Sequence, residues 1–315
     1  MLRYTLRQLE YFVAVGETGS IARASEKINV SSPSISAAIT QLEREFGLAL
    51  FVRQHAQGLS LTQAGRQMFE QARTVLREAG AMMDVAGEIT GSVRGPMVVG
   101  CLLTFAQVLL PALRRGFETA YPEVRLSQQE LDQTGLFSAL RRAEIDVALA
   151  YDLDLPADLQ FLPLLKLPPF ALMDEGHPLA ARDAVTVDEL RAYPMVLLDL
   201  PLSADYFLSV FDSTGPRPVI AERTRDMAVM RSLVANGFGY SIANVRPLNR
   251  LSPDGKPLRF VPIAGPVRPM RMGLLTARGA EGSNAVRAFM DHCRSLARTT
   301  GLPGIEGIAI TDAAR

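Results

Sequence analysis

The stretch SSPSISAAIT, residues 31–40, places hydroxyl groups and small side chains on one face of a predicted helix. The other face carries apolar residues at spacings of four, three and four, which indicates one buried stripe: Ile35, Ile39, Leu42 and Phe46. The polar face consists of Ser34, Ser36, Ala37, Thr40, Gln41 and Arg44. Hydroxyl, amide and guanidinium groups bond to phosphates and base edges, and small side chains let a helix lie deep in the major groove. The chemistry offered here is that of nucleic-acid contact.

A second group of polar side chains follows predicted strands farther along the chain, at Thr104, Thr134, Tyr151, Asp152, Ser203, Asp226 and Ser241. In sheets that alternate with helices, ligands bind outside the carboxyl ends of strands, beside helix N-termini. Thr104 and Ser203 are each predicted to cap the helix that follows. Hydroxyls and helix N-termini favour an anion, most simply a carboxylate, whereas Asp152 would accept a bond from a hydroxyl or an amine. The alternative is that each hydroxyl is an ordinary helix cap.

Catalytic and metal-binding motifs are missing from the sequence, which contains no nucleophile elbow, P-loop, dinucleotide-binding glycine motif or metal-ligand spacing. We therefore expect no enzyme, no metal and no cofactor. Its two cysteines, Cys101 and Cys293, are too few for a disulfide scaffold and favour a reduced, cytoplasmic protein. The N-terminal residues lack a signal-peptide core, and no apolar run is long enough for a membrane span. The net charge is zero, so the case for DNA depends on local arrangement.

The elements around residues 31–40 follow a helix-turn-helix pattern. Residues 6–15 have helical spacing, and Ser20 is a good N-cap for a second short helix. Ser32 is predicted to cap the third helix, with Pro33 as its first helical residue and Gly47 after its end. Two short helices joined by a tight turn, the second with a small polar outer face, are typical of DNA-binding units. The alternative is a small helical bundle with no ligand.

A long stretch without proline, residues 62–90, carries apolar residues alternately four and three apart. Such a heptad seam over about three repeats favours the pairing of two helices. It predicts dimerisation through Met68, Ala72, Val75, Ala79, Met82 and Ala86. The alternative is a helix that lies on its own domain. The GSVRG segment at 91–95 has the composition of a hinge.

Beyond residue 95, short apolar runs alternate with amphipathic helices. Buried strands are predicted at 97–103, 124–131 and 145–151, and one intervening helix at 135–143. Alternation of this kind indicates an α/β domain with parallel sheets.

The order of residues in the first sixty-five positions resembles the DNA-binding domain of LysR-type transcriptional regulators. The matches include the Leu6, Leu9 and Phe12 opening, Gly19-Ser20, Val30-Ser31, Pro33, Ser36, Ile39, Leu42-Glu43, Gly47, Leu50-Phe51, Arg53, Leu61-Thr62 and Ala64-Gly65. The resemblance implies a winged helix-turn-helix with a small β-wing near residues 52–61. It also implies that Pro33 touches thymine methyls, Ser36 a phosphate or base edge, and Arg53 a phosphate. The full set of predicted DNA-binding residues is Ser32, Pro33, Ser34, Ser36, Ala37, Thr40, Gln41 and Arg53.

This sequence departs from the family at positions that bear on DNA affinity. Ser32 stands where most members have Gln, Ala37 stands where many have Arg, and the wing lacks its usual arginines. Residues 1–65 contain six Lys or Arg and five Asp or Glu, a net charge of only +1. Fewer phosphate contacts per head imply weaker nonspecific binding and a shallower salt dependence, which oligomerisation could offset.

The rest of the chain resembles the regulatory domain of the same family, which has the fold of type 2 periplasmic binding proteins. The matching pieces are YPEVRL (121–126), the segment ending AEIDVALAY (143–151), HPLA (177–180) and NGFGYSIAN (236–244). The resemblance implies two subdomains with a ligand cleft between them.

The predicted fold class is therefore multidomain α + α/β. Its parts are a winged helix-turn-helix (1–62), a linker and dimerisation helix (63–90), a hinge (91–95), a periplasmic-binding-protein-like domain of two subdomains (96–165 with 268–300, and 166–267) and a loosely ordered tail (301–315). The predicted function is a regulator that binds an inverted-repeat operator as a dimer or a dimer of dimers and responds to a small organic effector. RNA polymerase is a further candidate partner, and no membrane is expected. Two alternatives remain: an oligomeric small-molecule-binding protein without specific DNA binding, and an enzyme built on the cleft.

Overall fold

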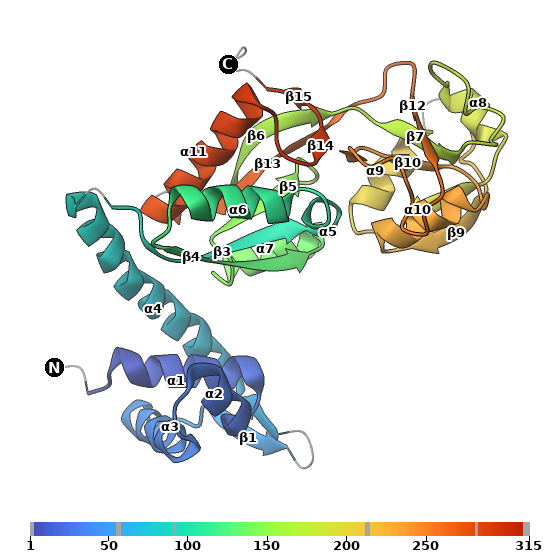
Figure 1. Cartoon of the computed structure of the whole chain (residues 1–315). Helices are drawn as coiled ribbons and strands as arrows, with labels where there is room; N and C mark the ends of the chain where they lie inside the picture. Colours follow the sequence, from blue (N-terminus) through green and yellow to red (C-terminus); the bar gives the residue numbers. More distant parts are fainter. Residues whose placement is uncertain (1–2, 55–57, 91, 212–214, 281–282, 311–315) are drawn as a thin grey trace. The chain divides into compact units, whose positions relative to one another are not determined.

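The computed structural model describes residues 3–54, 58–90, 92–211, 215–280 and 283–310. The chain separates into two compact units, Met1–Thr90 and Gly91–Arg315, each with its own core (Figure 1).

The first unit is a winged helix-turn-helix followed by a long helix. Its elements are α1 (Leu6–Thr18), α2 (Ile21–Ile28), α3 (Ser32–Phe46), β1 (Phe51–Gln54), β2 (Gly58–Leu61) and α4 (Gln63–Thr90). A capping box of Thr5 and Gln8 starts α1, and Gly19 ends it in the left-handed conformation with φ 64°. The predicted helix-turn-helix and wing are confirmed, since β1 and β2 pair antiparallel between Phe51 and Leu61.

The start of α3 differs by one residue from the prediction. Ser31, not Ser32, is the N-cap: its φ of −60° and ψ of 138° are extended, and its carbonyl accepts from the Ile35 N–H. Pro33 accordingly lies one position farther into the first turn, where its missing N–H still costs no helical bond.

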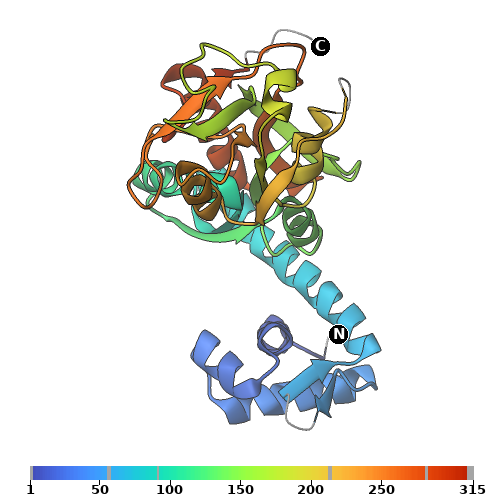
Figure 2. The same ribbon diagram turned by 90° about the vertical axis from the view of Figure 1, so that its right-hand side faces the viewer.

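The apolar stripe of α3 forms the centre of the first unit. Ile35, Ala38, Ile39 and Leu42 are buried, and they pack in two clusters with residues of α1. The long helix α4 runs unbroken in both views (Figures 1 and 2). Its first turns cover α1, because Phe69 and Ala72 belong to the same cluster as Phe12.

The second unit contains two groups of strands, which we call the first and second lobes. The first lobe comprises β3 (Gly95–Leu102), α5 (Leu103–Ala106), α6 (Leu110–Ala120), β4 (Val124–Leu131), α7 (Gln133–Arg141), β5 (Val147–Tyr151), β6 (Leu159–Leu167), β13 (Met270–Ala277), α11 (Asn284–Thr299) and β15 (Ile308–Ala309). Its strands form one six-stranded sheet in the order β15-β6-β13-β5-β3-β4.

The sheet of the first lobe is mixed rather than parallel, which corrects the prediction. Strand β3 pairs parallel with β4 and β5, because helices carry the chain back between these strands. Strand β13 returns from the second lobe and enters the sheet in the opposite direction, so it pairs antiparallel with β5 and β6. The sequence pattern does not encode this direction, since a buried strand is apolar in either case.

The second lobe is inserted between β6 and β13. It comprises β7 (Phe170–Asp174), α8 (Val187–Arg191), β8 (Met195–Leu198), α9 (Ser203–Ser209), β9 (Ile220–Thr224), α10 (Met227–Ala235), β10 (Ser241–Ala243) and β12 (Leu258–Pro262). Strand β7 lies between β10 and β12 and pairs antiparallel with both, whereas β8 and β9 pair parallel. The buried residues of both lobes form one continuous apolar cluster.

The predicted loose tail is wrong for its first half. Residues of this segment form β14 (Ile305–Glu306), which pairs with β11 (Arg246–Pro247), and β15, which pairs with β6. Leu302 and Ile305 are buried, so apolar anchors hold this segment to the unit. Residues 311–315 lie outside the described ranges.

Candidate functional site

The exposed face of α3 is the first candidate site. Pro33, Ser34, Ser36, Ala37, Thr40 and Gln41 are all exposed, and Ser32 is half-buried. A surface hollow of about 580 Å³ follows this face and is lined by Pro33, Ser36, Ala37, Thr40, Gln41 and Arg44. None of these six side chains is acidic, so nothing in the lining repels a phosphate backbone. Five of the seven predicted DNA-binding residues of α3 thus line one accessible surface, and Ser32 and Ser34 lie outside its lining.

Hydrogen bonds already orient several hydroxyls on this face. The Ser31 and Ser34 hydroxyls lie 2.8 Å apart, and the Thr40 hydroxyl donates to the Ser36 carbonyl at 3.0 Å. A threonine that bonds back to its own helix presents its methyl group and an oxygen lone pair outward. This face therefore combines small apolar groups with a few polar atoms, as contact with base edges requires.

The structure describes the backbone of the wing strands but not the side chain of the predicted phosphate-binding arginine. Arg53 lies in β1 opposite Leu59, and its side chain lies outside the described part of the chain, as do residues 55–57. Its predicted phosphate contact stays a prediction.

The seam predicted for α4 divides into two parts. Ala72 is 4% exposed and is buried by α1 of its own unit, while Met68 and Val75 pack at the edge of the same cluster. Assigning Ala72 to a dimer interface was therefore wrong, because the first turns of α4 complete the core of the head. Farther along, Met82 is 74% exposed, Ala79 is half-buried, and the side chain of Ala86 lies outside the described residues.

Val85, which the heptad pattern did not include, is also strongly exposed on α4. It lies three positions after Met82, so the two apolar side chains lie on one face of the helix. Two exposed large apolar residues on one face offer a contact surface for another helix.

The second candidate site is a group of buried polar atoms in the second unit. Ser241 Oγ and Asn244 Oδ1 are buried and have no hydrogen-bond partner among the described residues, and the buried Thr104 hydroxyl has the Tyr151 hydroxyl as its polar neighbour. Thr104 was predicted to cap a helix, but Leu102 occupies that position and Thr104 lies inside α5. Its hydroxyl therefore does not cap the helix. Buried polar atoms without partners are rare in proteins and mark places where a ligand or water completes the bonding.

A tyrosine connects this group to the first lobe. The Tyr206 hydroxyl donates to the Arg268 carbonyl at 2.6 Å and accepts from Asn244 Nδ2 at 3.3 Å. Asn244 Nδ2 also donates to the Leu167 carbonyl at 2.7 Å. Burial raises the pKa of Tyr206, so its phenol stays neutral and keeps its proton as a donor. The bonds to the Arg268 and Leu167 carbonyls join the second lobe to the segments that connect it with the first lobe.

Asp152 is already occupied by the protein itself. Its Oδ2 accepts from Arg271 Nε at 2.6 Å and from Arg268 Nη2 at 3.1 Å, and its Oδ1 accepts from the Arg271 N–H at 2.7 Å. A ligand hydroxyl or amine would have to compete with these two guanidinium groups for the Asp152 oxygens, and the predicted contact stays a prediction. The local charge of these three groups is +1.

Three other predicted effector residues, Tyr151, Asp226 and Thr134, have structural roles. Tyr151 is buried at the end of β5 beside Phe105, with ring centroids 4.7 Å apart. Asp226 caps α10 by accepting from the Ala228 and Val229 N–H groups. Thr134 is exposed and bonds to Asp132, which is the actual cap of α7.

Ser203 is the first residue of α9 rather than its cap. The cap position belongs to Leu202, whose φ is 64°, and the Ser203 N–H donates to the Pro201 carbonyl at 2.7 Å. A left-handed conformation at a branched residue is strained and is held here by the tight turn. Ser203 is buried, but its predicted capping role is wrong.

No pattern in the sequence singles out Tyr206, Arg268 or Arg271. Tyr206 lies in the middle of a helix, and the two arginines lie in a proline-containing segment without a motif. Only the return of β13 beside β5 brings these arginines to Asp152. No local signal in the sequence could have indicated that contact.

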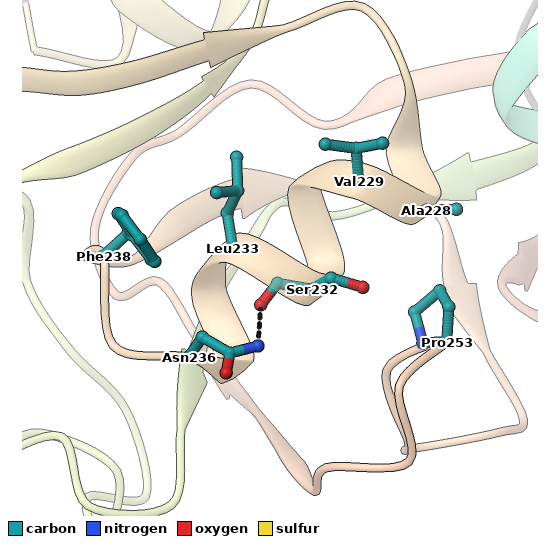
Figure 3. A pocket seen from close by; sticks show the side chains of 7 residues that line it. All are labelled: Ala228, Val229, Ser232, Leu233, Asn236, Phe238 and Pro253. Carbon is teal, nitrogen blue, oxygen red and sulfur yellow. Dashed lines mark hydrogen bonds between the residues drawn. The ribbon is translucent and has the colours of Figure 1, made fainter.

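An apolar hollow of about 360 Å³ lies on α10 (Figure 3). It is lined by Ala228, Val229, Ser232, Leu233, Asn236, Phe238 and Pro253. The Asn236 amide is already engaged, since its Nδ2 donates to the Ser232 carbonyl and to Asp254 and its Oδ1 accepts from Lys256. With no ionisable side chain in the lining, this hollow is a poor place for a carboxylate.

The described residues contain no group of three or more His, Cys, Asp and Glu that could hold a metal ion. Within the same ranges, every helix is too short or too polar to cross a bilayer. Both cysteines are buried, and burial raises the pKa of each thiol.

Two sequence families match this chain. Residues 6–66 match the family described as bacterial regulatory helix-turn-helix protein, lysR family, and residues 90–298 match the LysR substrate binding domain. The crystal structure of a putative LysR family transcriptional regulator from Pseudomonas aeruginosa is 35% identical, with a TM-score of 0.62, over 93% of this chain and 99% of that one.

Two further relatives are similar to this chain over nearly its whole length. The hydrogen peroxide-inducible genes activator of Escherichia coli O6:H1 is 28% identical over 297 residues, which is 91% of this chain and 96% of the relative. The structure of full-length CbnR complexed with the target DNA is 23% identical, covers 92% of this chain and 99% of that one, and has a TM-score of 0.64. At that identity CbnR shows a shared fold.

Proposed function

Because the chain belongs to the LysR family of transcriptional regulators, we propose that it binds an inverted-repeat operator as an oligomer and that a small organic carboxylate switches it. A regulator of this family has a DNA-binding helix-turn-helix and an effector-binding domain. The observation that carries the proposal is the exposed face of α3, where small and polar side chains form one accessible surface without an acidic group. Such a regulator would act in the cytoplasm, where RNA polymerase is a further partner.

Oligomerisation follows from the weak charge of one head. A net charge of +1 over residues 1–65 supplies few phosphate contacts, so a single head would bind DNA weakly. Two linked heads bind two half-sites with a high effective concentration. The exposed Met82 and Val85 of α4 are the contacts that we assign to this pairing. A twofold dimer reads an inverted repeat.

We assign the effector to the buried polar atoms of the second unit, among which Asn244 is bonded to Tyr206. The Thr104 and Ser241 hydroxyls would donate to its oxygens, and Asn244 Oδ1 would accept from a hydroxyl or amine of the same molecule. The excess positive charge of Arg268 and Arg271 over Asp152 favours an anion nearby. A small hydroxy or amino carboxylate satisfies both requirements.

The name of one relative mentions hydrogen peroxide, but a response to peroxide through a cysteine thiol does not suit this chain. The nucleophile in such chemistry is the thiolate. Cys101 and Cys293 are the two cysteines of the sequence; both are buried, and burial raises the pKa of both. Neither thiol is poised to react.

The test of the operator proposal is a selection from genomic DNA. Sheared DNA of the source organism is incubated with the full chain at two salt concentrations, and the retained fragments are sequenced. We expect a few sites that share an inverted repeat. Ser36→Glu should weaken binding to those sites about a hundredfold or more, since a carboxylate in the groove faces phosphates. The fold should survive, because Ser36 is exposed.

Gln67→Glu, which makes the same change of charge on an exposed position of α4, is the matched control and should bind normally. Equal retention of all fragments, or unchanged affinity of Ser36→Glu, would overturn the proposal. The binding protein that lacks specific DNA recognition would then be the better description.

A further inference from the structure

A chain of hydrogen bonds runs from the start of α1 to the exposed face of α3. The Thr5 backbone N–H donates to Gln8 Oε1 at 2.8 Å, and the Thr5 hydroxyl lies 3.2 Å from the same oxygen. Gln8 Nε2 donates to Gln41 Oε1 at 2.8 Å. Gln8 is half-buried and Gln41 is exposed, so the chain ends at the surface of α3.

The donor-to-acceptor direction of this chain of hydrogen bonds cannot reverse. A glutamine amide has one end that accepts and one that donates, and either end can face a neighbour when nothing decides between them. Here the Thr5 backbone N–H is a donor in every state, so Gln8 must turn its oxygen to Thr5 and its nitrogen to Gln41. Gln41 must then turn its oxygen to Gln8.

The Gln41 amino group consequently points away from Gln8. Its Nε2 has no partner among the described residues and lies on the face shared with Ser36, Thr40 and Arg44. The Thr40 hydroxyl hydrogen is already used by its own helix. The amide of Gln41 is therefore a fixed N–H donor on that face.

We propose that Gln8 is a positioning residue for DNA recognition, which holds the Gln41 amide so that its N–H groups donate to an acceptor atom of the operator. The inference rests on the proposed function of α3 as the helix that meets DNA. The acceptor is an oxygen or nitrogen, either on a base edge in the major groove or on a phosphate. The cap of α1 thus decides which end of an amide on another helix meets the DNA.

Gln8→Glu tests the inference with little disturbance of the fold. Glutamate is as good a partner as glutamine in a capping box, so α1 keeps its start. The second carboxylate oxygen can only accept, so Gln41 must turn its amino group inward and present its oxygen to DNA. We expect the dissociation constant for the selected operator to rise about three- to tenfold, the effect of one hydrogen bond. An unchanged melting temperature checks that the cap is intact.

A double-mutant cycle separates this effect from charge repulsion by the new carboxylate. In a Gln41→Ala background, Gln8→Glu should cost no more than the control Gln67→Glu, because there is no amide left to turn. Equal losses from Gln8→Glu in both backgrounds, or no loss in the wild-type background, would overturn the inference. Ser36→Glu, measured beside them, reports separately on whether α3 meets DNA at all.

A library of operators randomised within each half-site identifies the acceptor. If the acceptor lies on a base, Gln8→Glu should shift the preference at one position toward a base that presents a donor, such as cytosine. If it lies on a phosphate, all sequences should weaken equally. Both results support the positioning role and assign its target.

Discussion

At the scale of single residues, the second unit holds buried polar atoms that its own fold does not satisfy. Ser241 buries a hydroxyl without a partner in the described part of the chain, Asn244 buries a free carbonyl oxygen beside its engaged amide nitrogen, and the buried Thr104 hydroxyl has only the Tyr151 hydroxyl beside it. A site of this kind lowers the stability of the empty protein and gains bonds when a polar ligand enters. Asp152 behaves in the opposite way, since both of its oxygens already accept bonds from the protein.

Thr104→Val should separate stability from ligand binding. Valine has the same shape without the hydroxyl, whose one polar neighbour is the Tyr151 hydroxyl, so the free energy of unfolding should change by no more than about 1 kcal/mol. The stabilisation that a matching small hydroxy or amino carboxylate confers on the wild type should be lost. Thermal melting against a panel of such acids measures both effects.

Thr119→Val, at an exposed threonine of α6, is the matched control and should keep the response. If Thr104→Val is stabilised by the same acid as strongly as the wild type, Thr104 does not touch the effector.

At the scale of elements, α4 does two tasks along its length. Its first turns bury Phe69 and Ala72 against α1 and so belong to the head, whereas Met82 and Val85 are exposed. The heptad spacing continues across both parts and does not distinguish them. The reason is physical: a seam of apolar residues fits a helix of the same chain as well as a helix of a second chain.

Met82→Glu should raise the dissociation constant of the oligomer at least about tenfold, because each copy loses an apolar contact and gains a charge. Its head should remain folded. Sedimentation over a range of concentrations measures the association, and Gln67→Glu is again the control. A variant that associates as the wild type does would remove Met82 from the interface.

At the scale of the whole molecule, two cores do not share residues. The clusters of the first unit end within α4, and the large cluster of the second unit begins after residue 91. Each unit therefore has the apolar interior that independent folding requires.

A fragment that begins at Ser92 should fold alone and unfold in one cooperative transition. We expect the full chain to unfold in two transitions in calorimetry, one for each unit. The melting temperature of the fragment should match one of them to within a few degrees, because the two cores share no residues. A fragment that stays unfolded would show that the units stabilise each other.

Whereas the wing was implied by the resemblance to the family, local patterns in the sequence were enough to predict the helix-turn-helix, the length of α4 and the exposed face of α3. Each depends on neighbours a few residues apart: caps such as Ser20, the spacing of Ile35, Ile39 and Leu42, and the glycine after a helix. Side-chain periodicity and backbone caps are short-range properties, so the chain carries them in order.

Only the tertiary structure decided the remaining points. The antiparallel entry of β13, the two arginines on Asp152, the burial of Ala72 and the bond from Gln8 to Gln41 all join residues far apart in the chain. A polar residue at a strand end looks the same whether it caps a helix, pairs with an arginine or stays free for a ligand. Which of these it does depends on the partner that the fold brings to it.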